Sequence, residues 1–406
     1  MGREERMGGG EGAVGGGGTG PSAPGREGLV DRVVHKVTLF LLGVVHMLLS
    51  SDRRWSKSGA VDPDVLVTEK VEDLSRVTLV FIRHGESAWN DIFNKGFGPG
   101  FVLRLARGLV MEVVHFATLG SVFLDSELNA EGVEQAAALR GFIQGAAKTA
   151  AAAGPPAAGA SAEARTKNEV VRAMAGSGEA SVVVSSNLRR AIATVAVCLW
   201  DRLALGRERV LLMSELQEIS RNVDTLSVSP AGRVPEPPDV EAYVRAHPAA
   251  GGAPPVAAVL DGKLNRGNKS YRGHGIDRLR GFASWAVARQ EKVVIVAGHS
   301  LWFKYFFQTF LPHGSAHVGK TSKIANGGVV ALTLTCGVDK EGRTVYRVPP
   351  ESVTPIHLGF EKPKDAKKKK RSGWIVPAVA AISSGLAGAV VFTRLWRGNA
   401  LSGAAE

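Results

Sequence analysis

Residues 77–90 read Val-Thr-Leu-Val-Phe-Ile-Arg-His-Gly-Glu-Ser-Ala-Trp-Asn. The first six are apolar or β-branched and carry no charge, which is typical of a strand buried on both faces of a sheet. Arg83, His84 and Gly85 follow at once. Open α/β sheets bind ligands at the carboxyl ends of their strands. The segment therefore predicts a buried strand that delivers a cation and an imidazole to a binding crevice.

Two further apolar segments end in residues of the same kind. Residues 182–184 lead to Ser185 and Arg190, and residues 293–297 lead to His299. If all three strands are parallel, two arginines and two histidines meet at one edge of the sheet. The planar guanidinium of arginine can donate two parallel hydrogen bonds to one phosphate. The arrangement therefore predicts a phosphate-binding site.

Strand and helix patterns alternate along this part of the chain. A fourth strand is expected at 329–334, and Asn129 has the properties of a helix N-cap. Helical patterns are found at 129–142, 188–205, 276–289 and 301–311. Such alternation is typical of a three-layer α/β/α sandwich with a largely parallel sheet, which is the fold class we expect.

The string Arg83-His-Gly-Glu86 resembles the signature of the histidine phosphatase superfamily, which includes the cofactor-dependent phosphoglycerate mutases. Four later segments are similar to further motifs of that family, in the family's order: residues 125–136, residues 185–194, Leu216-Gln-Glu218 and Gly298-His-Ser300. Asn187 stands where the family usually has proline, and Ser300 where glycine is common. The resemblance is confined to residues 77–334.

The resemblance implies a two-step route through a phosphohistidine. The residues that carry the match are His84, Glu218, Arg83, Arg190, His299 and Asn90. His84 would attack phosphorus as a neutral imidazole, and Glu218 would protonate the leaving alcohol and then take a proton from water. The two arginines and His299 would hold the equatorial oxygens, while Asn90 would contact the phosphate or support the loop. No metal or other cofactor is implied, because the protein supplies the cations.

Three assignments have competitors nearby in the sequence. Arg189 precedes Arg190, although the spacing of the family motif favours Arg190. Glu215 lies three residues before Glu218, and either carboxyl could be the proton donor. Ser300 could be the nucleophile of a serine hydrolase, but Trp302 occupies the position where the nucleophile elbow needs a second glycine.

The predicted function is phosphomonoester hydrolysis, with a phosphorylated small molecule or a phosphoprotein as substrate. One alternative is phosphoryl transfer between hydroxyls of one substrate, as in a phosphoglycerate mutase. Another is a non-catalytic, membrane-anchored scaffold of the same fold. Release of free phosphate would indicate the phosphatase, and formation of an isomer would indicate the mutase. Loss of the proton donor would indicate the scaffold.

The chain of 406 residues is expected to hold one catalytic domain with appendages. Residues 1–28 are Gly-rich and predict disorder. Residues 29–60 contain an apolar block at 37–51, which predicts either a membrane-associated helix or a helix packed on the catalytic domain. Residues 61–361 form the catalytic domain, with a flexible Ala- and Gly-rich insertion at 145–180.

The C-terminal region is predicted to be a tail anchor. A basic linker at 362–371 precedes residues 372–393, which carry no charged side chain and are long enough to cross a bilayer. Residues 394–406 form a short tail. The net charge of +12 is concentrated in part beside this apolar segment, which favours a membrane edge over nucleic acid.

We expect the catalytic domain to face the cytosol, because the larger basic cluster precedes the tail helix. Ser384 and Gly388 have a small-xxx-small spacing through which two tail helices could form a homodimer.

Overall fold

The computed structural model describes residues 29–362, apart from 56–60, 97, 116–117, 119, 155–158, 206–207, 236–237, 251 and 253. The predicted disordered start, the tail anchor at 372–393 and the final tail lie outside these residues. Of the predicted basic linker, only Lys362 is described. The tail anchor, the tail-mediated homodimer and the cytosolic orientation therefore stay predictions from the sequence.

The strand predicted at the start of the first motif lies inside an eight-stranded sheet, in the order β4-β3-β2-β5-β1-β6-β7, with β8 paired to β6. The strands are β1 (Ser75–Arg83), β2 (Ser181–Ser186), β3 (Val210–Met213), β4 (Leu260–Asp261), β5 (Val293–Gly298), β6 (Val329–Val338), β7 (Thr344–Arg347) and β8 (Thr354–His357). Strands β1 to β5 pair in parallel, as predicted. The four predicted strands all form, and they place Arg83, Ser185 and Gly298 at one edge.

The prediction of a largely parallel sheet is wrong, because β6, β7 and β8 are antiparallel and the sheet is mixed. Strand β6 starts beside the end of β1: the Gly327 N–H donates to the Arg83 carbonyl and the Arg83 N–H donates to the Gly328 carbonyl, both at 3.1 Å. The chain thus re-enters the sheet at the site edge and must run backward. A short turn then joins β6 to β7, and only antiparallel neighbours allow such a turn.

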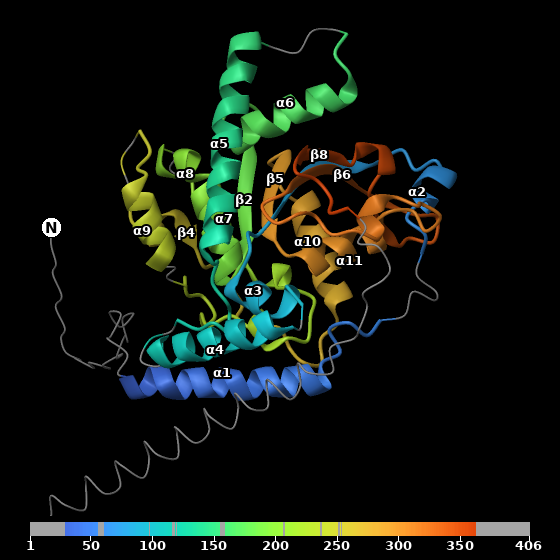
Figure 1. Cartoon of the computed structure of the whole chain (residues 1–406). Coiled ribbons are helices and arrows are strands. Elements are labelled where there is room, and N and C mark those ends of the chain that lie inside the picture. Colours follow the sequence, from blue (N-terminus) through green and yellow to red (C-terminus); the bar gives the residue numbers. More distant parts are fainter. Residues whose placement is uncertain are drawn as a thin grey trace, which may run out of the picture.

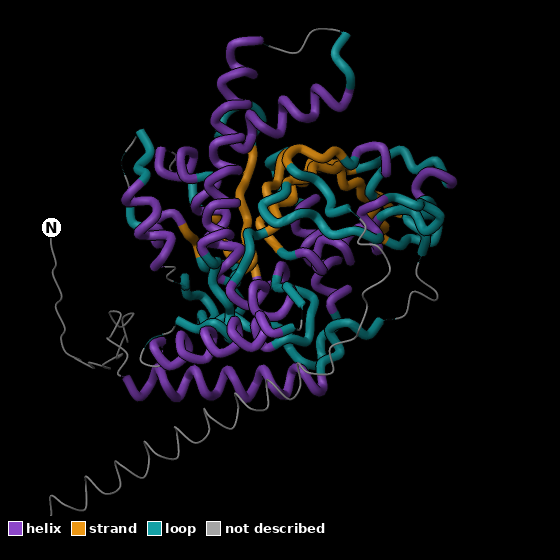
Figure 2. The backbone as a smooth tube through the Cα atoms, viewed as in Figure 1, coloured by secondary structure: helices purple, strands orange, loops and turns teal. Residues whose placement is uncertain are grey.

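Helices cover both faces of the sheet, so the α/β sandwich is present (Figures 1 and 2). On β1, Val80 and Ile82 face one helical layer while Leu79 and Phe81 face the other, as the two-residue period of a strand requires. The first layer contains α5 (Ala130–Ala153), α6 (Ala162–Met174), α7 (Arg189–Cys198), α8 (Trp200–Leu205) and α9 (Pro238–Ala246). The second contains α10 (Gly275–Val287) and α11 (Ser300–Phe310), from which Phe303 stacks on Phe81 at 4.4 Å.

The segment 145–180, predicted to be a flexible insertion, is largely helical where it is described. Helix α5 starts at the predicted N-cap, where the Asn129 side chain accepts from the Gly132 N–H, and it continues to Ala153. Helix α6 then returns to the sheet and buries Val170 and Met174. Alanine favours helix, so an Ala-rich composition is compatible with either outcome until packing decides.

The N-terminal apolar block forms α1 (Leu29–Leu49), which packs on the catalytic domain. Its Leu39 and Phe40 are buried among side chains of α3 (Ala88–Asn94) and of the segment 122–124. The region that follows α3 contains α4 (Pro99–Val114). Residues Val30–Leu49 are long and apolar enough to cross a membrane, with one third of the window buried. Length and composition are weak evidence for a span.

The short α2 (Val65–Thr68) lies against β6.

Two glycines allow the His84 loop to approach α5 closely. A Cβ added to Gly85 would lie 2.4 Å from the Gly132 carbonyl oxygen. A Cβ added to Gly132 would lie 2.1 Å from the Glu86 carbonyl oxygen. Real carbon and oxygen atoms cannot approach so closely, so a side chain at either position must displace the backbone. The loop that carries His84 is therefore held at a distance that only glycine permits.

We expect Gly132→Ala to lower the free energy of unfolding by about 1–3 kcal/mol, because the added methyl group forces the two backbones apart. Activity should fall as well, since the displaced segment adjoins His84. The matched control is Gly141→Ala in the same helix, where a Cβ would meet no atom within 4 Å. That change should raise stability by about 0.5–1 kcal/mol through helix propensity. Urea unfolding measures both, and equal effects would contradict the close-approach argument.

Candidate active site

His84 directly follows β1 and is almost completely buried. Its Nδ1 lies 2.6 Å from the Gly85 carbonyl oxygen. A carbonyl oxygen only accepts, so Nδ1 must carry the ring proton in this bond. The lone pair of the neutral ring is then on Nε2. The Gly85 N–H donates to the Thr194 hydroxyl at 3.0 Å, which ties the loop to α7. The local backbone thus selects the tautomer that a nucleophilic histidine needs.

His299, at the end of β5, lies beside His84 with ring centroids 5.1 Å apart. Its Nε2 is 2.8 Å from the Ser186 hydroxyl, and its Nδ1 is buried with no hydrogen-bond partner among the described residues. Burial, followed by the charge of Arg190, holds the pKa of both imidazoles well below 6.5. Both rings are therefore neutral near pH 7.

Arg83 and Arg190 bring positive charge to the two histidines. Arg190 is buried at the start of α7, where its Nη1 donates to the Asp224 carbonyl at 3.0 Å and its Nη2 lies 3.5 Å from the Asp224 carboxylate. Arg83 is buried at the end of β1, with its Nη1 2.5 Å from the Ile324 carbonyl and from Glu361 Oε1. Its Nε has no partner among the described residues.

Arg189, the competitor of Arg190, points elsewhere. Its guanidinium donates to the carbonyls of Asp125 and Leu124 and pairs with Glu127. Its backbone N–H donates to the Asp125 carboxylate at 2.8 Å. Arg189 therefore holds the segment 121–127 in place, and its neighbour Arg190 lines the pocket.

The two candidate acids are also placed differently. Glu218 lies at the start of α11: its Oε1 accepts from the Trp302 N–H at 2.8 Å and its Oε2 from the Leu301 N–H at 3.3 Å. Glu215 instead pairs with the exposed Arg266 at 3.3 Å and does not line the pocket. Only Glu218 is within the pocket, where its more weakly bonded Oε2 is available for a further partner.

A pocket of about 190 Å³ collects the residues that the sequence singled out. Arg83, His84, Asn90, Arg190 and Glu218 all line it, and His299 adjoins it through the ring of His84. Asn90 accepts from the Asn94 side chain at 2.8 Å. The other lining residues are Trp89, Asn94, Ser220, Asn222, Asp224, Thr225, Ser300, Leu301 and Lys323. Five predicted residues thus share one small cavity, although they span more than a hundred positions of sequence.

Asp224 and Lys323 are site residues that the sequence analysis missed. Burial, opposed by Arg190, raises the pKa of Asp224 to about 6, and its Oδ1 has no partner among the described residues. Burial, followed by the charge of Arg83, lowers the pKa of Lys323. Asp224 lies in the 3-10 turn Val223–Thr225 and Lys323 in a loop, neither with a recognisable motif, so only their proximity to Arg190 and Arg83 reveals them. The one signal for Asp224 is its ion pair with Arg190. A search for acidic partners of the predicted site arginines could have found it.

The pocket is suited to an anion. It is lined by two arginines and a lysine against the two carboxyls of Glu218 and Asp224, and burial raises the pKa of Asp224 to about 6. Buried polar atoms normally have partners, so Arg83 Nε and His299 Nδ1, which have none among the described residues, are available to hydrogen-bond a bound anion if His299 carries its proton on Nδ1. No group of His, Cys, Asp and Glu among the described residues could hold a metal ion.

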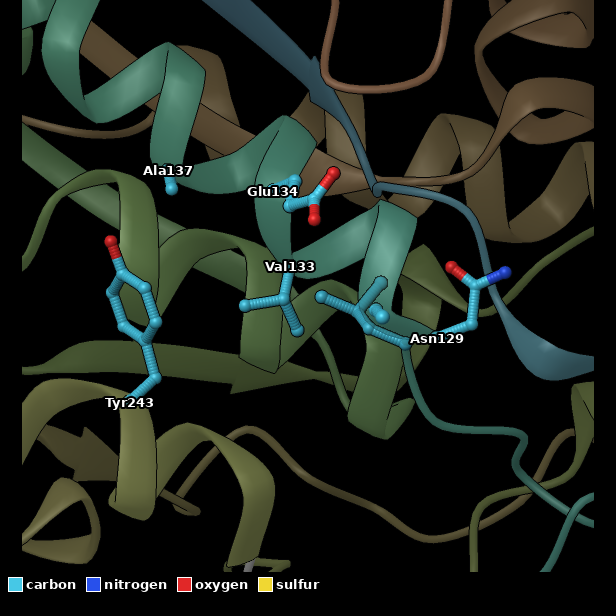
Figure 3. A pocket seen from close by; sticks show the side chains of 7 residues that line it. Asn129, Val133, Glu134, Ala137 and Tyr243 are labelled. Atoms are coloured by element: carbon cyan, nitrogen blue, oxygen red, sulfur yellow. The ribbon is translucent and has the colours of Figure 1, made fainter.

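A second pocket of about 470 Å³ lies between α5 and α9. Figure 3 shows Val133 and Tyr243 on its opposite walls, and its lining contains no histidine, arginine or lysine. It therefore lacks the groups that phosphate chemistry requires.

No protein-family model and no curated protein matches the chain. Solved structures do match, and they are members of the histidine phosphatase superfamily. A mycobacterial glucosyl-3-phosphoglycerate phosphatase is 17% identical, with 67% of this chain and 97% of that chain covered and a TM-score of 0.31. A phosphoserine phosphatase from Entamoeba histolytica is 15% identical over 71% and 98%, with a TM-score of 0.27.

A phosphoglycerate mutase from Thermus thermophilus is 18% identical, with 67% of this chain and 98% of that chain covered and a TM-score of 0.26. These neighbours agree with the family resemblance of the motifs. The fold follows from the strand pairing of this chain, and the chemistry that it can perform follows from the geometry of the pocket.

Proposed function

We propose that the chain is a phosphomonoesterase that works through a phosphohistidine on His84. The observation that carries the proposal is the state of His84: a buried, neutral imidazole between two arginines, whose Nδ1 is bound to the Gly85 carbonyl and whose Nε2 has no hydrogen-bond partner in the part of the chain that the structure describes. A neutral ring with a directed lone pair is a nucleophile, and the arginines favour the anion that it must attack.

In the first step, the Nε2 lone pair of His84 forms a bond to phosphorus, and the bond from phosphorus to the ester oxygen breaks. The leaving oxygen takes a proton from Glu218. In the second step, water attacks phosphorus, gives its proton to Glu218, and the nitrogen–phosphorus bond breaks to release phosphate. Glu218 thus returns to its starting state after each cycle.

Arg83, Arg190 and His299 hold the phosphoryl oxygens through both steps. If the Ser186 hydroxyl donates to Nε2 of His299, the opposite nitrogen carries the proton and can donate to an oxygen. The charge that develops on the equatorial oxygens is then met by fixed donors, so little reorganisation is needed in the transition state.

To test the proposal, p-nitrophenyl phosphate and 3-phosphoglycerate are offered as substrates in the presence of EDTA, and their products are measured. We expect release of inorganic phosphate that persists without added divalent metal. Formation of 2-phosphoglycerate without free phosphate would instead support the mutase alternative. Absence of both reactions, together with absence of phosphoryl transfer to the protein from a broad set of phosphomonoesters, would favour the non-catalytic scaffold.

The same assay across pH separates the roles of the two carboxyls. Asp224 is protonated below its pKa of about 6, so below that pH Arg190 is free to bind phosphate. Above it, the Asp224 carboxylate competes for Arg190, and kcat/KM should fall roughly tenfold over about two pH units, mainly through KM.

Asp224→Asn should remove this part of the decline without abolishing kcat. Because the native chain and Asp224→Asn are assayed with the same substrate, the ionisation of the substrate affects both pH profiles equally. Glu218→Gln should instead lower kcat by about 10²–10⁴-fold at every pH, because the leaving oxygen loses its proton donor. If Asp224→Asn abolishes kcat while Glu218→Gln preserves it, the two roles are exchanged.

A further inference from the structure

Helices α1 and α4 lie side by side at one end of the molecule (Figure 1). The Lys36 ammonium of α1 is 2.9 Å from the Glu112 carboxylate of α4 and donates to the His115 carbonyl at 3.0 Å. Lys36 and Glu112 are both buried. A buried ion pair between the two helices fixes them as one unit, so they present a common surface.

The inner faces of the two helices are packed on the domain. Leu39 and Phe40 of α1 are buried, and Phe101 and Leu105 of α4 pack against the same cluster. The fit is close: a Cβ on Gly43 would lie 3.1 Å from the Val223 side chain. This contact argues against α1 crossing a membrane, because its inner face belongs to the protein core.

The outer faces are apolar and exposed. Fourteen of the twenty large apolar side chains that are exposed among the described residues belong to these two helices. They include Leu41 and Leu48 of α1, at 56% and 58%, and Leu103 and Val113 of α4, at 74% and 75% exposure. Soluble monomers rarely expose so concentrated an apolar surface, and such patches mark docking sites.

The exposed charges around this surface are mainly positive. The acidic residues of the two helices are Asp31, in the first turn of α1, and the buried Glu112. Arg107 of α4 is exposed, as are Arg53 and Arg54 just after the end of α1. An apolar face rimmed by arginines is complementary to a bilayer with anionic headgroups.

We propose that the outer faces of α1 and α4 form a docking surface for a lipid bilayer that contains anionic lipids, with both helices lying in the interface. The surface is independent of the predicted tail anchor. It also adjoins the active site, because α3 contributes Trp89 and Asn90 to the pocket and packs on α4, while the turn Val223–Thr225 lines the pocket and packs on α1. Docking would therefore place the pocket near the headgroups.

The test uses the full chain with a polarity-sensitive fluorophore on a single introduced cysteine. Cys336→Ser removes the more accessible of the two native thiols, since Cys198 is buried. The probe sites are Leu42→Cys on α1 and Val110→Cys on α4, at 52% and 63% exposure in the native chain. The control is Val67→Cys on α2, which at 56% is equally exposed but lies elsewhere.

Vesicles of phosphatidylcholine with phosphatidylserine should shift the emission of both probes to the blue, and brominated acyl chains should quench them. The probe at position 67 should not respond. The paired change Leu42→Glu with Val110→Glu should weaken vesicle binding roughly tenfold or more, whereas Val67→Glu should have no effect.

Other occupants of the surface give different results, and each would overturn the proposal. Vesicle binding without a response at positions 42 and 110 would show that the tail alone attaches the chain. A blue shift without vesicles, independent of protein concentration, would show that a segment of the chain such as 372–393 covers the surface. A shift that grows with concentration would show a second copy there.

Discussion

Replacing His84 by Ala is expected to lower kcat by roughly 10⁴-fold or more, because no other group near the pocket can take its place as nucleophile. The neighbouring His299 has its Nε2 engaged by Ser186. The remaining nucleophilic candidate is Ser300, which lines the same pocket at the start of α11. No base stands in hydrogen-bond contact with its hydroxyl among the described residues, so Ser300 should not rescue turnover.

The measurement is radiolabel transfer from a ³²P-labelled phosphomonoester, stopped with alkaline denaturant because phosphohistidine survives base and is lost in acid. The native chain should retain acid-labile label during turnover, and His84→Ala should retain none. Ser300→Ala should keep both the label and most of the activity.

His313→Ala is the matched control, since this histidine is exposed and pairs with Asp62 far from the pocket. It should behave as the native chain does. Label that survives in His84→Ala, or label that is stable to acid, would contradict a nucleophilic role for His84.

The second large effect concerns the adjacent Arg190 and Arg189. Replacing Arg190 should mainly impair catalysis, and replacing Arg189 should mainly lower stability. Arg190→Ala should lower kcat/KM by about 10²–10³-fold, because the phosphoryl group loses a bidentate, charged donor in a buried site. Stability should change less, because the pKa of Asp224 is already raised to about 6 and its carboxyl can take up a proton when Arg190 is removed.

Arg189→Ala should instead lower the free energy of unfolding by about 3–5 kcal/mol. Its partner Asp125 is fully buried, and burial already raises the pKa of that carboxyl against the attraction of Arg189. Removing the guanidinium leaves the buried Asp125 carboxyl without its nearest charge partner and the buried carbonyls of Asp125 and Leu124 without their donor. The catalytic constants of the fraction that remains folded should be close to native.

Urea unfolding and steady-state kinetics on the same two preparations separate these effects. If Arg189→Ala impairs kcat/KM in a chain of native stability while Arg190→Ala does not, then the assignment of the phosphate ligand moves to Arg189.

Local signals in the sequence were sufficient for the strands that carry the site. Residues 77–82 and 293–297 are uncharged runs of apolar or β-branched residues, and each is followed by polar residues that the structure places at the sheet edge. The Asn129 cap was equally local, because its side chain bonds to a backbone N–H three residues on. Such features depend on neighbours in sequence and are therefore readable there.

Features that depend on distant partners were not readable. The direction of β6 is set by where Gly327 and Gly328 meet Arg83, and an apolar run looks the same in either direction. The short β3 and β4 have too few residues to show a period. Asp224 and Lys323 belong to no motif, and their shifted pKa values arise from burial and from charges that the fold brings to them.

The amino-acid sequence by itself determined which groups reach the edge of the sheet, because a buried strand and the polar residue after it are adjacent along the chain. Only the tertiary structure decided which of those groups share the pocket: Arg190 enters it while Arg189 binds Asp125. The tertiary structure alone also decided that α1 lies beside α4. In each case the deciding interaction joins segments far apart in the chain, and its strength depends on burial that exists only in the folded state.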